Sequence, residues 1–375
     1  MESEIAVIAR GLDGVVVDET SVCLADKQSD RLSYRGYSIE NLSELASFEE
    51  VAYLLIYGDL PNAGQLEAYR VRLAGMRTLS APQLRILQLL PRDADPMDVL
   101  RTTCSALGSY EPETPARSLA DIGNRLIACL PSALMYWYHY HDTGKAIDVD
   151  SGEATVAGNL LALLRGSAPS DLTRRAIDVS LIVYAEHDFN ASTFAAMVAT
   201  STLSDAYSAF VAAIGALRGP LHGSANASVL RFISKFESAD EAEAAVRKQL
   251  ASKSRIPGFG QRAYSRSDPR NAINKIWAKR LVEASEQPLL FNISNRVEEL
   301  LMRERKMFAN LDYYTATIYE QCGLPVELFA PMFFIARVAG LVAHIAEQRA
   351  NNRIIHPSSK YVGPAARPFP NLSER

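Results

Sequence analysis

The feature that most limits how this chain can fold is a long apolar stretch near its C-terminal end. Between residues 325 and 348 nearly every position is apolar, so a helix formed there would be apolar on all faces. The stretch contains Arg337 and His344, which are costly inside lipid. We therefore expect a helix that is buried all round in a globular protein, and not a membrane span.

Helix start and stop signals recur along the rest of the chain. Ser47 and Glu50 form a capping box before an apolar run, and Gly58 is placed to end that helix. Asp95, followed by proline, predicts the start of another helix, which Gly108 should close. Further helices are expected at 116–141, 154–165, 173–186, 224–236, 239–251, 271–284 and 292–306.

Strand signals are few. Residues 14–24 alternate weakly, and together with 31–34 they predict a small N-terminal β-ribbon. Residues 192–217 are rich in Ala, Ser and Thr, which predicts one helix that lies deep in the molecule or in a subunit contact. Strand and helix never alternate along the chain, which disfavours a doubly wound α/β fold. The predicted fold class is all-α.

Length and charge restrict the class of protein. A chain of 375 residues is longer than one small core needs, which favours a large domain with a smaller one. The net charge of -4 disfavours a nucleic-acid or membrane-surface binder. The four cysteines lie far apart, without a C-x-x-C pair or a signal-peptide pattern, so we expect a cytoplasmic protein with packed cysteines.

One segment departs from this acidic balance. Residues 247–280 contain ten Lys or Arg and a single acid, Asp268. A turn-forming stretch at 256–260 interrupts the run, and glycine backbone N–H groups flanked by cations suit phosphates and carboxylates. The segment predicts a site for a small polyanion; the alternative is a solvated basic face. Nucleic-acid binding is disfavoured because exposed aromatic residues are scarce there.

Two residues have neighbours that suit catalysis. His222 lies between glycines in a turn between two predicted helices, where a neutral imidazole can donate a hydrogen bond to a developing oxyanion. Asp312 precedes two tyrosines, and apolar surroundings raise the pKa of a carboxylate toward that of a general base. The alternatives are an inconsequential loop histidine and a helix N-cap. The six histidines have no metal-ligand spacing, so no metal site is expected.

Stretches from about residue 11 to residue 363 resemble, in order, the motifs of citrate synthases. They are GLDGVVVDETSVCLAD with LSYRGY, AEHDFNASTF, STLSDAYSAFVAAIGALRGPLHG, GFGQRAY with DPR, NLDYYTATIY, FFIARVAGLVAHIAEQ and NRIIHPSSKYVGP. The resemblance implies an all-α homodimer. It also implies a large domain of residues 1–222 and 322–375, and a small domain of residues 223–321 that closes over the site.

The resemblance also implies an activity and its substrates. Asp312 would remove an α-proton from an acyl-CoA, and His222 would stabilise the resulting thioester enol. Arg262 would contact the CoA phosphates, in agreement with the basic segment. The substrates would be an acyl-CoA and a 2-oxo dicarboxylic acid, with no permanently bound cofactor.

The second substrate meets both matching and altered residues. The resemblance implies that His187, Arg270 and Arg337 hold the oxo acid. Gln261, however, stands where the family has a catalytic histidine, and a glutamine amide can donate a hydrogen bond but cannot deliver a proton. His356 stands where the family has an arginine that reaches into the neighbouring subunit's site.

Three functions therefore remain open at the level of sequence. The first is a citrate synthase, which makes citrate and CoA from acetyl-CoA, oxaloacetate and water. The second is a 2-methylcitrate synthase or a diverged relative with another electrophile. The third is a protein that binds CoA or a tricarboxylate without catalysis, for which Gln261 is the strongest indication.

Overall fold

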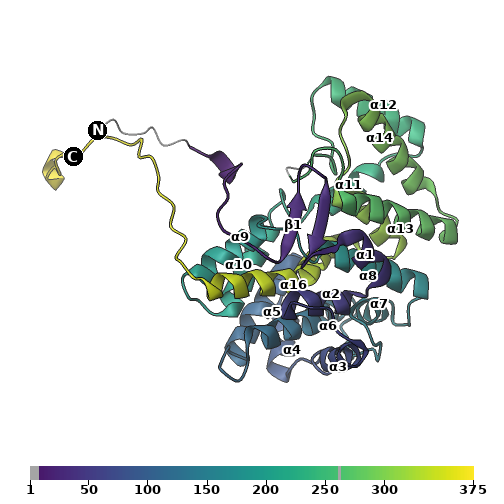
Figure 1. Cartoon of the computed structure of the whole chain (residues 1–375), viewed down its shortest axis with the longest axis horizontal. Coiled ribbons are helices and arrows are strands. Elements are labelled where there is room, and N and C mark those ends of the chain that lie inside the picture. Colours follow the sequence, from purple (N-terminus) through teal and green to yellow (C-terminus); the bar gives the residue numbers. More distant parts are fainter. Residues whose placement is uncertain (1–7, 261–262) are drawn as a thin grey trace.

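The computed structural model describes residues 8–260 and 263–375, and these form a mostly helical molecule (Figure 1). The all-α prediction is confirmed. The α-helices are α1 (Ile39–Leu45), α2 (Phe48–Tyr57), α3 (Ala63–Ala74), α4 (Ala81–Leu89), α5 (Pro96–Tyr110), α6 (Leu119–Thr143), α7 (Val156–Arg165), α8 (Asp171–Tyr184), α9 (Ala191–Ser201), α10 (Ala206–Leu217), α11 (Ala225–Ile233), α12 (Ala239–Ala251), α13 (Pro269–Ser285), α14 (Leu289–Arg305), α15 (Leu311–Gln321) and α16 (Phe329–Ala350).

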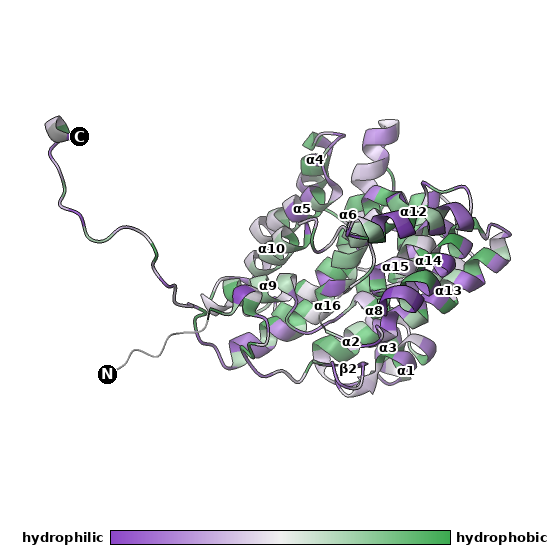
Figure 2. Ribbon diagram, turned by 90° about the horizontal axis from the view of Figure 1, so that it is seen from above, coloured by the Kyte–Doolittle hydropathy of each residue, from purple (hydrophilic) through white to green (hydrophobic). Residues whose placement is uncertain are grey.

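Helix α16 is the centre of the fold. It is apolar along most of its length (Figure 2) and contacts α2, α5, α6, α8, α9, α10 and α11. In the described part of the chain, Val326–Ala350 is the one helical segment long and apolar enough to cross a membrane, and its apolar window is wholly buried inside the protein. It is therefore a core helix, as the sequence predicts.

Local capping signals place the helix ends well, with one exception. Ser47 and Glu50 form the predicted capping box of α2, and Gly58 ends that helix in the left-handed conformation, with φ of 100°. Gly108, in contrast, does not end α5, which continues to Tyr110. A Cβ on Gly108 would lie 2.9 Å from the Cβ of Tyr207, so this glycine lets α10 approach α5 closely.

The predicted helix over 192–217 is wrong in one respect: it is two helices. Helix α9 ends at Ser201 and α10 begins at Ala206, with Leu203 between them in the left-handed region, at φ of 63°. Asp205 starts α10 by accepting a hydrogen bond from the Ser208 N–H at 3.1 Å. The two helices pack against each other and against α16.

The N-terminal ribbon has three antiparallel strands, β1 (Cys23–Asp26), β2 (Arg31–Tyr34) and β3 (Tyr37–Ser38), with Cys23 opposite Tyr34. It is shorter than predicted, because pairing begins only at Cys23. The turn between β1 and β2 binds the loop before α13. In this turn, Asp30 accepts a hydrogen bond from the Ser265 N–H at 2.7 Å and forms an ion pair with Arg266.

Helices α11 to α15 form a group of their own. Helix α12 packs against α14, and α15 packs against both α11 and α13. Contacts of α13 and α15 with α8, and of α11 with α16, join this group to the rest of the molecule (Figure 1). The division into a large domain and a closing small domain at residues 223–321 stays a prediction.

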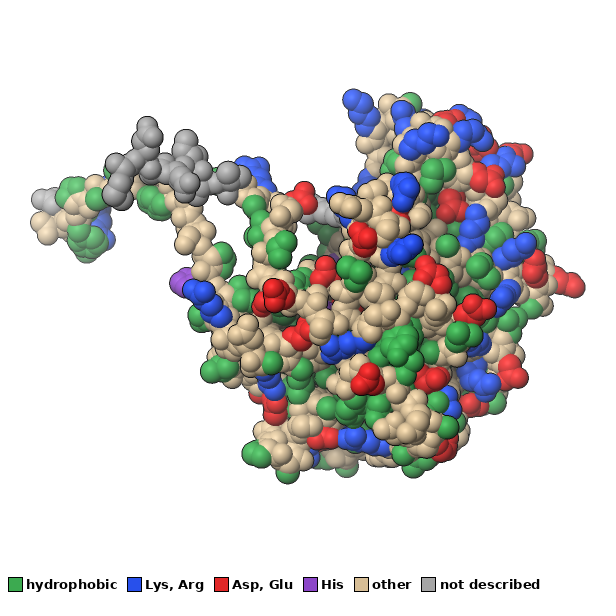
Figure 3. All heavy atoms as spheres, in the orientation of Figure 1, with side chains coloured by type: hydrophobic (Ala, Val, Ile, Leu, Met, Phe, Trp, Pro, Cys, Tyr) green, Lys and Arg blue, Asp and Glu red, His purple; other side chains and the backbone are tan. Residues whose placement is uncertain are grey.

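The C-terminal segment after α16 leaves the body of the molecule. Residues 357–373 are exposed, and the segment extends away from the helices in two perpendicular views (Figures 1 and 2). It also stands apart from the body of the molecule in the space-filling view (Figure 3). It nevertheless carries large apolar side chains, among them Tyr361, Val362 and Phe369, the last of which is 88% exposed. We call residues 357–375 the C-terminal tail.

Candidate active site

Asp312 lies in the first turn of α15, next to the end of α8. The hydroxyl of Tyr184, the last residue of α8, donates a 2.6 Å hydrogen bond to Oδ1 of Asp312. Asn310 caps α15 by accepting from the Asp312 N–H at 3.1 Å, and its own N–H donates to the carbonyl of Gly258 at 2.9 Å. Asn310, and not Asp312, is thus the N-cap, which leaves the Asp312 carboxylate available for other work.

The surroundings of Asp312 tune it as a base. Burial raises the pKa of Asp312 to about 6, while the Tyr184 hydrogen bond and the positive charge of Arg270 oppose that rise. A carboxyl group with such a pKa is ionised at neutral pH and still accepts a proton readily. The arrangement fits a general base.

His222 is held as a neutral imidazole in the turn before α11. Its Nε2 atom lies 3.3 Å from the backbone N of Ser192 and 2.9 Å from the Ser192 hydroxyl oxygen. Because a backbone N–H can only donate, Nε2 is the acceptor and the ring proton is on Nδ1. Burial and the nearby charge of Arg337 lower the pKa of His222 to about 4, so Nδ1–H is a neutral donor.

The ring of Phe333 on α16 connects these groups. Its centroid lies 5.5 Å from that of His222 and 4.6 Å from that of Tyr184. The guanidinium carbon of Arg337 lies 4.8 Å from the same ring. Tyr184, which holds Asp312, and His222 therefore both lie against the ring of Phe333, which we call the apolar floor of the site. The cation beside this ring is Arg337.

Arg337 is buried and has one hydrogen-bond donor that is not paired within the described residues. Its side chain is 1% exposed, and its Nε donates to the backbone carbonyl of Tyr184 at 2.9 Å. Its Nη1 is also buried but has no hydrogen-bond partner among the described residues. Leaving a buried guanidinium N–H unpaired is costly, so this atom marks a place for an anionic group.

A second pair of basic groups lies near Arg337. Nε2 of His187 is 3.0 Å from the hydroxyl oxygen of Tyr264, whose ring lies 5.9 Å from the Arg270 guanidinium carbon. Burial and the charges of Arg270 and Arg337 hold the pKa of His187 well below its usual value. Asp268 orients Arg270, accepting from Nε at 2.9 Å and from Nη2 at 2.8 Å.

The described structure places one predicted site residue away from this cluster and does not describe two others. Gln261 and Arg262 lie outside the described residues. His356 is exposed, beyond the end of α16 and next to the C-terminal tail. Its predicted reach into a neighbouring subunit stays a prediction.

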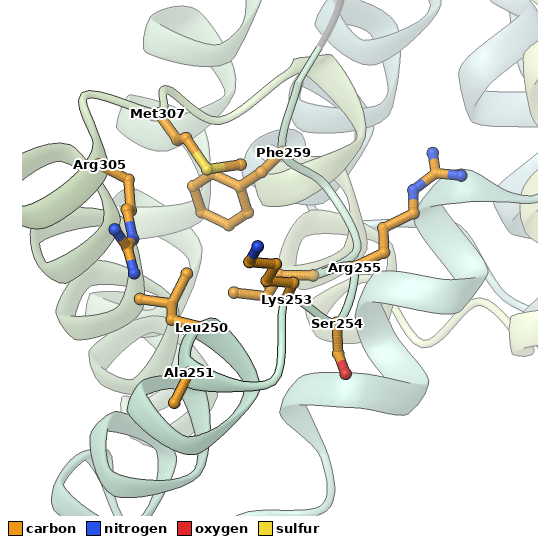
Figure 4. Close-up of a pocket in the computed structure, with 9 residues that line it drawn as sticks. Leu250, Ala251, Lys253, Ser254, Arg255, Phe259, Arg305 and Met307 are labelled. Carbon is orange, nitrogen blue, oxygen red and sulfur yellow. The ribbon is translucent and has the colours of Figure 1, made fainter.

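Several cations of the basic segment are ion-paired, and a cavity of about 420 Å³ is lined by two of the others, Lys253 and Arg255. Arg247, Arg266, Arg270 and Lys275 each have an acidic partner. Figure 4 shows Lys253 amid the cavity-lining side chains, while Arg255 points away from them. The cavity is lined by Leu250, Ala251, Lys253, Ser254, Arg255, Ile256, Phe259, Arg305 and Met307. Its mixture of cations and apolar side chains suits a phosphate joined to an aromatic base.

Sequence patterns alone did not identify Tyr184, Ser192, Tyr264 or Phe333. Each acts through a partner distant in sequence, such as Tyr184 with Asp312, 128 residues away. The available signal was position: Tyr184 lies directly before the AEHDFN stretch, and Ser192, Tyr264 and Phe333 lie inside the motifs quoted above. Across the described residues, no group of three or more His, Cys, Asp or Glu side chains could hold a metal ion.

Comparisons with known proteins cover nearly the whole chain. The family described as "Citrate synthase, C-terminal domain" matches residues 11–358. The 2-methylcitrate synthase of Shewanella oneidensis is 44% identical, over 97% of each chain. The crystal structure of citrate synthase from Thermotoga maritima is 35% identical, has a TM-score of 0.87, and matches over 98% of this chain and 99% of that one. A Thermoplasma acidophilum citrate synthase in complex with carboxymethyl coenzyme A and oxaloacetate is 28% identical, with a TM-score of 0.90 over 98% of this chain and 100% of that one.

Proposed function

The chain belongs to the citrate synthase family of condensing enzymes, and on this premise we propose that it joins acetyl-CoA to oxaloacetate, with citrate and CoA as products. The observation that carries the proposal is the pairing of a base and a neutral donor around one apolar floor. Asp312 has a pKa of about 6, and His222 has a pKa of about 4 with its proton on Nδ1.

In the proposed first step, Asp312 takes a proton from the α-carbon of the acyl group. The electron pair of the broken C–H bond becomes the double bond of an enol, and charge develops on the thioester oxygen. The Nδ1–H of His222 donates a hydrogen bond to that oxygen. A preorganised donor of this kind accelerates a reaction by on the order of 10²- to 10³-fold.

In the second step, the enol carbon forms a bond to the keto carbon of oxaloacetate, and the π electron pair of that C=O bond moves onto the keto oxygen. This oxygen takes a proton from solvent, Asp312 returns its proton to solvent, and water then cleaves the thioester to release CoA. We propose that the buried, unpaired Nη1 of Arg337 binds a carboxylate of the oxo acid. His187 and Arg270 line the same region, since the charges of both arginines act on His187. Gln261 would donate to the keto oxygen without delivering a proton.

We assign the CoA nucleotide to the cavity beside Phe259. Lys253 and Arg305 supply positive charge there for phosphate groups, and Phe259 and Met307 supply an apolar wall for the adenine (Figure 4). Phe259 also bridges to Ala309, directly before the cap of α15. The cavity is thus joined by a short stretch of backbone to the base that would act on the acyl group. Arg262 stays a proposed phosphate contact.

A second candidate donor is propionyl-CoA, which would give 2-methylcitrate. The name of the Shewanella oneidensis relative, which is 44% identical over 97% of this chain, favours it. Both acyl-CoA substrates carry an acidic hydrogen on the carbon next to the thioester, so the same residues would serve either reaction.

We also propose that the active unit is a cytoplasmic homodimer. The C-terminal tail supports a dimer, because exposed side chains such as Val362 and Phe369, 87% and 88% exposed, would be covered by a second copy. His356, which directly precedes this tail, would then lie near the site of the partner subunit. A histidine there supplies less positive charge than an arginine.

The test is thiol release from acetyl-CoA and propionyl-CoA across a panel of 2-oxo acids, alongside deuterium exchange at the acyl α-carbon. We expect release with oxaloacetate, and none in Asp312→Asn. Glu320→Gln, an exposed change on the same helix, serves as the matched control.

Exchange without thiol release on oxaloacetate would indicate a different electrophile. Neither exchange nor release, in protein that binds CoA, would contradict the catalytic proposal and favour a binding protein.

A further inference from the structure

Tyr184 touches the proposed base in a defined way. An ionised carboxylate can only accept, so the Tyr184 hydroxyl donates to Oδ1 of Asp312, at 2.6 Å. Nδ2 of Asn226, a fully buried residue, donates to the same hydroxyl oxygen at 3.4 Å. The Tyr184 hydroxyl therefore accepts a hydrogen bond from Asn226 and donates its own proton to Asp312.

The rest of Tyr184 is fixed equally firmly. Its side chain is fully buried, and its ring lies 4.6 Å from that of Phe333. Its backbone carbonyl accepts from Nε of Arg337 at 2.9 Å. One residue thus contacts the proposed base through its side chain and the proposed carboxylate-binding arginine through its backbone.

The two oxygens of Asp312 are not equivalent. Oδ1 is occupied by Tyr184, whereas no described residue donates a hydrogen bond to Oδ2. Asp312 is only partly buried, and its Oδ2 is left accessible and without a donor among the described residues.

We propose that Tyr184 is a positioning residue for proton transfer: by holding Oδ1 of Asp312, it leaves Oδ2 as the atom that takes the acyl α-proton. The inference rests on the proposed condensation. In the step concerned, the α-C–H bond breaks, its electrons form the enol double bond, and the proton goes to Oδ2. The Tyr184 proton stays on the phenol throughout.

The chain offers a matched control for this role. Helices α8 and α15 share a second hydrogen bond between side chains, from the Ser180 hydroxyl to the hydroxyl oxygen of Tyr319, at 2.9 Å. Tyr319→Phe removes a buried hydroxyl between the same two helices, but it leaves the Tyr184–Asp312 hydrogen bond intact. A purely structural role of Tyr184 predicts similar effects of both changes.

The experiment compares Tyr184→Phe, Tyr319→Phe and the unaltered enzyme by kcat, KM for the acyl-CoA and the pH profile of kcat. We expect kcat of Tyr184→Phe to fall on the order of 10- to 100-fold, the value of a hydrogen bond to a charged group, with KM little changed. The loss should be greater at pH 6 than at pH 8, because the lost hydrogen bond favoured the ionised carboxylate. Tyr319→Phe should keep the parent pH profile.

Equal kcat values and pH profiles for Tyr184→Phe and Tyr319→Phe would overturn the proposal. If Tyr184→Phe does not fold, Asn226→Ala, which removes the donor to the same hydroxyl, must shift the pH profile in the same direction; an unshifted profile would also overturn it. Inactivity of the unaltered enzyme with every acyl-CoA would instead contradict the proposed function.

Discussion

At the scale of single residues, the site depends on two groups whose pKa values are shifted in opposite directions. Asp312 has a raised pKa of about 6 and His222 a lowered pKa of about 4. Asp312 acts only when ionised, so kcat/KM should rise as pH increases through about 6. His222 is already neutral in that range and should add no limb. A pH profile of kcat/KM checks this, and a kcat/KM that stays constant as pH falls through about 6 would contradict the assignment of Asp312.

The substitution at position 261 gives a second prediction. A histidine can deliver a proton to the keto oxygen of oxaloacetate, whereas a glutamine cannot, and a general acid contributes on the order of 10²–10⁴ in rate. Gln261→His should therefore raise the turnover of oxaloacetate, measured by thiol release. Gln287→His, an exposed change between α13 and α14, is the control. An unchanged rate would show that Gln261 is not the limiting difference.

Residue-level prediction from sequence is possible where the neighbours in sequence create the environment of a side chain. Asp312 precedes two tyrosines and His222 lies between glycines, and both observations concern adjacent positions. Tyr184 and Ser192 could not be found this way, because their partners lie 128 and 30 residues away. Only the packing of α8 on α15, and of the start of α9 on the His222 turn, creates those contacts.

At the scale of elements, the loop at residues 256–260 depends on Gly258. This residue has φ of 82°, and a Cβ there would lie 2.5 Å from Cδ2 of Tyr313 and 2.8 Å from Cγ2 of Val229. Gly258→Ala should lower the free energy of unfolding by about 2–4 kcal/mol, from backbone strain and overpacking together.

Gly260 provides the comparison, because its φ of 86° is similar but no atom lies within 4 Å of the added Cβ. Gly260→Ala should cost only the strain, about 1 kcal/mol. Urea unfolding of both variants checks the difference. Equal stabilities would show that the contact with Tyr313 is relieved without cost.

Element-level prediction shows the same division between local and distant causes. The capping box of Ser47 and Glu50 is local, and α2 begins where it predicts. Gly108 was misassigned as a helix end because its cause is the approach of Tyr207 on another helix. The break between α9 and α10 was missed because Leu203, not glycine, adopts the left-handed conformation there.

At the scale of the whole molecule, two buried carboxyl groups tie three helices together. Glu49 of α2 accepts from the Val156 N–H at the start of α7, at 2.8 Å, and Asp178 of α8 accepts from the Phe48 N–H at the start of α2, at 2.9 Å. Burial and the neighbouring Asp178 raise the pKa of Glu49 from 4.5 to about 7.

A raised carboxyl pKa means that the folded state binds the proton more tightly than the unfolded state. Its contribution to stability is therefore full below pH 4.5 and is lost as pH rises to about 7. Glu49→Gln mimics the protonated form and should be more stable than the parent by on the order of 2–3 kcal/mol at pH 8, but nearly equal at pH 5.

Urea unfolding at both pH values and one protein concentration checks this prediction, with the exposed Glu44→Gln as control. A Glu49→Gln protein that is less stable at pH 8 would show that Glu49 is ionised in the folded state and stabilised by its surroundings.

The position of α16 also governs when the molecule can form. This helix occupies the centre and contacts seven other helices, all of which precede it in the sequence. Glu347 near its end accepts hydrogen bonds from the hydroxyls of Thr20 and Ser21, so residues at the start of the described chain also wait for this helix. During synthesis, the preceding helices leave the ribosome without their central partner and expose apolar surfaces to the cell. The core therefore cannot be completed until α16 has been synthesised, and the unfinished chain exposes surfaces that chaperones bind.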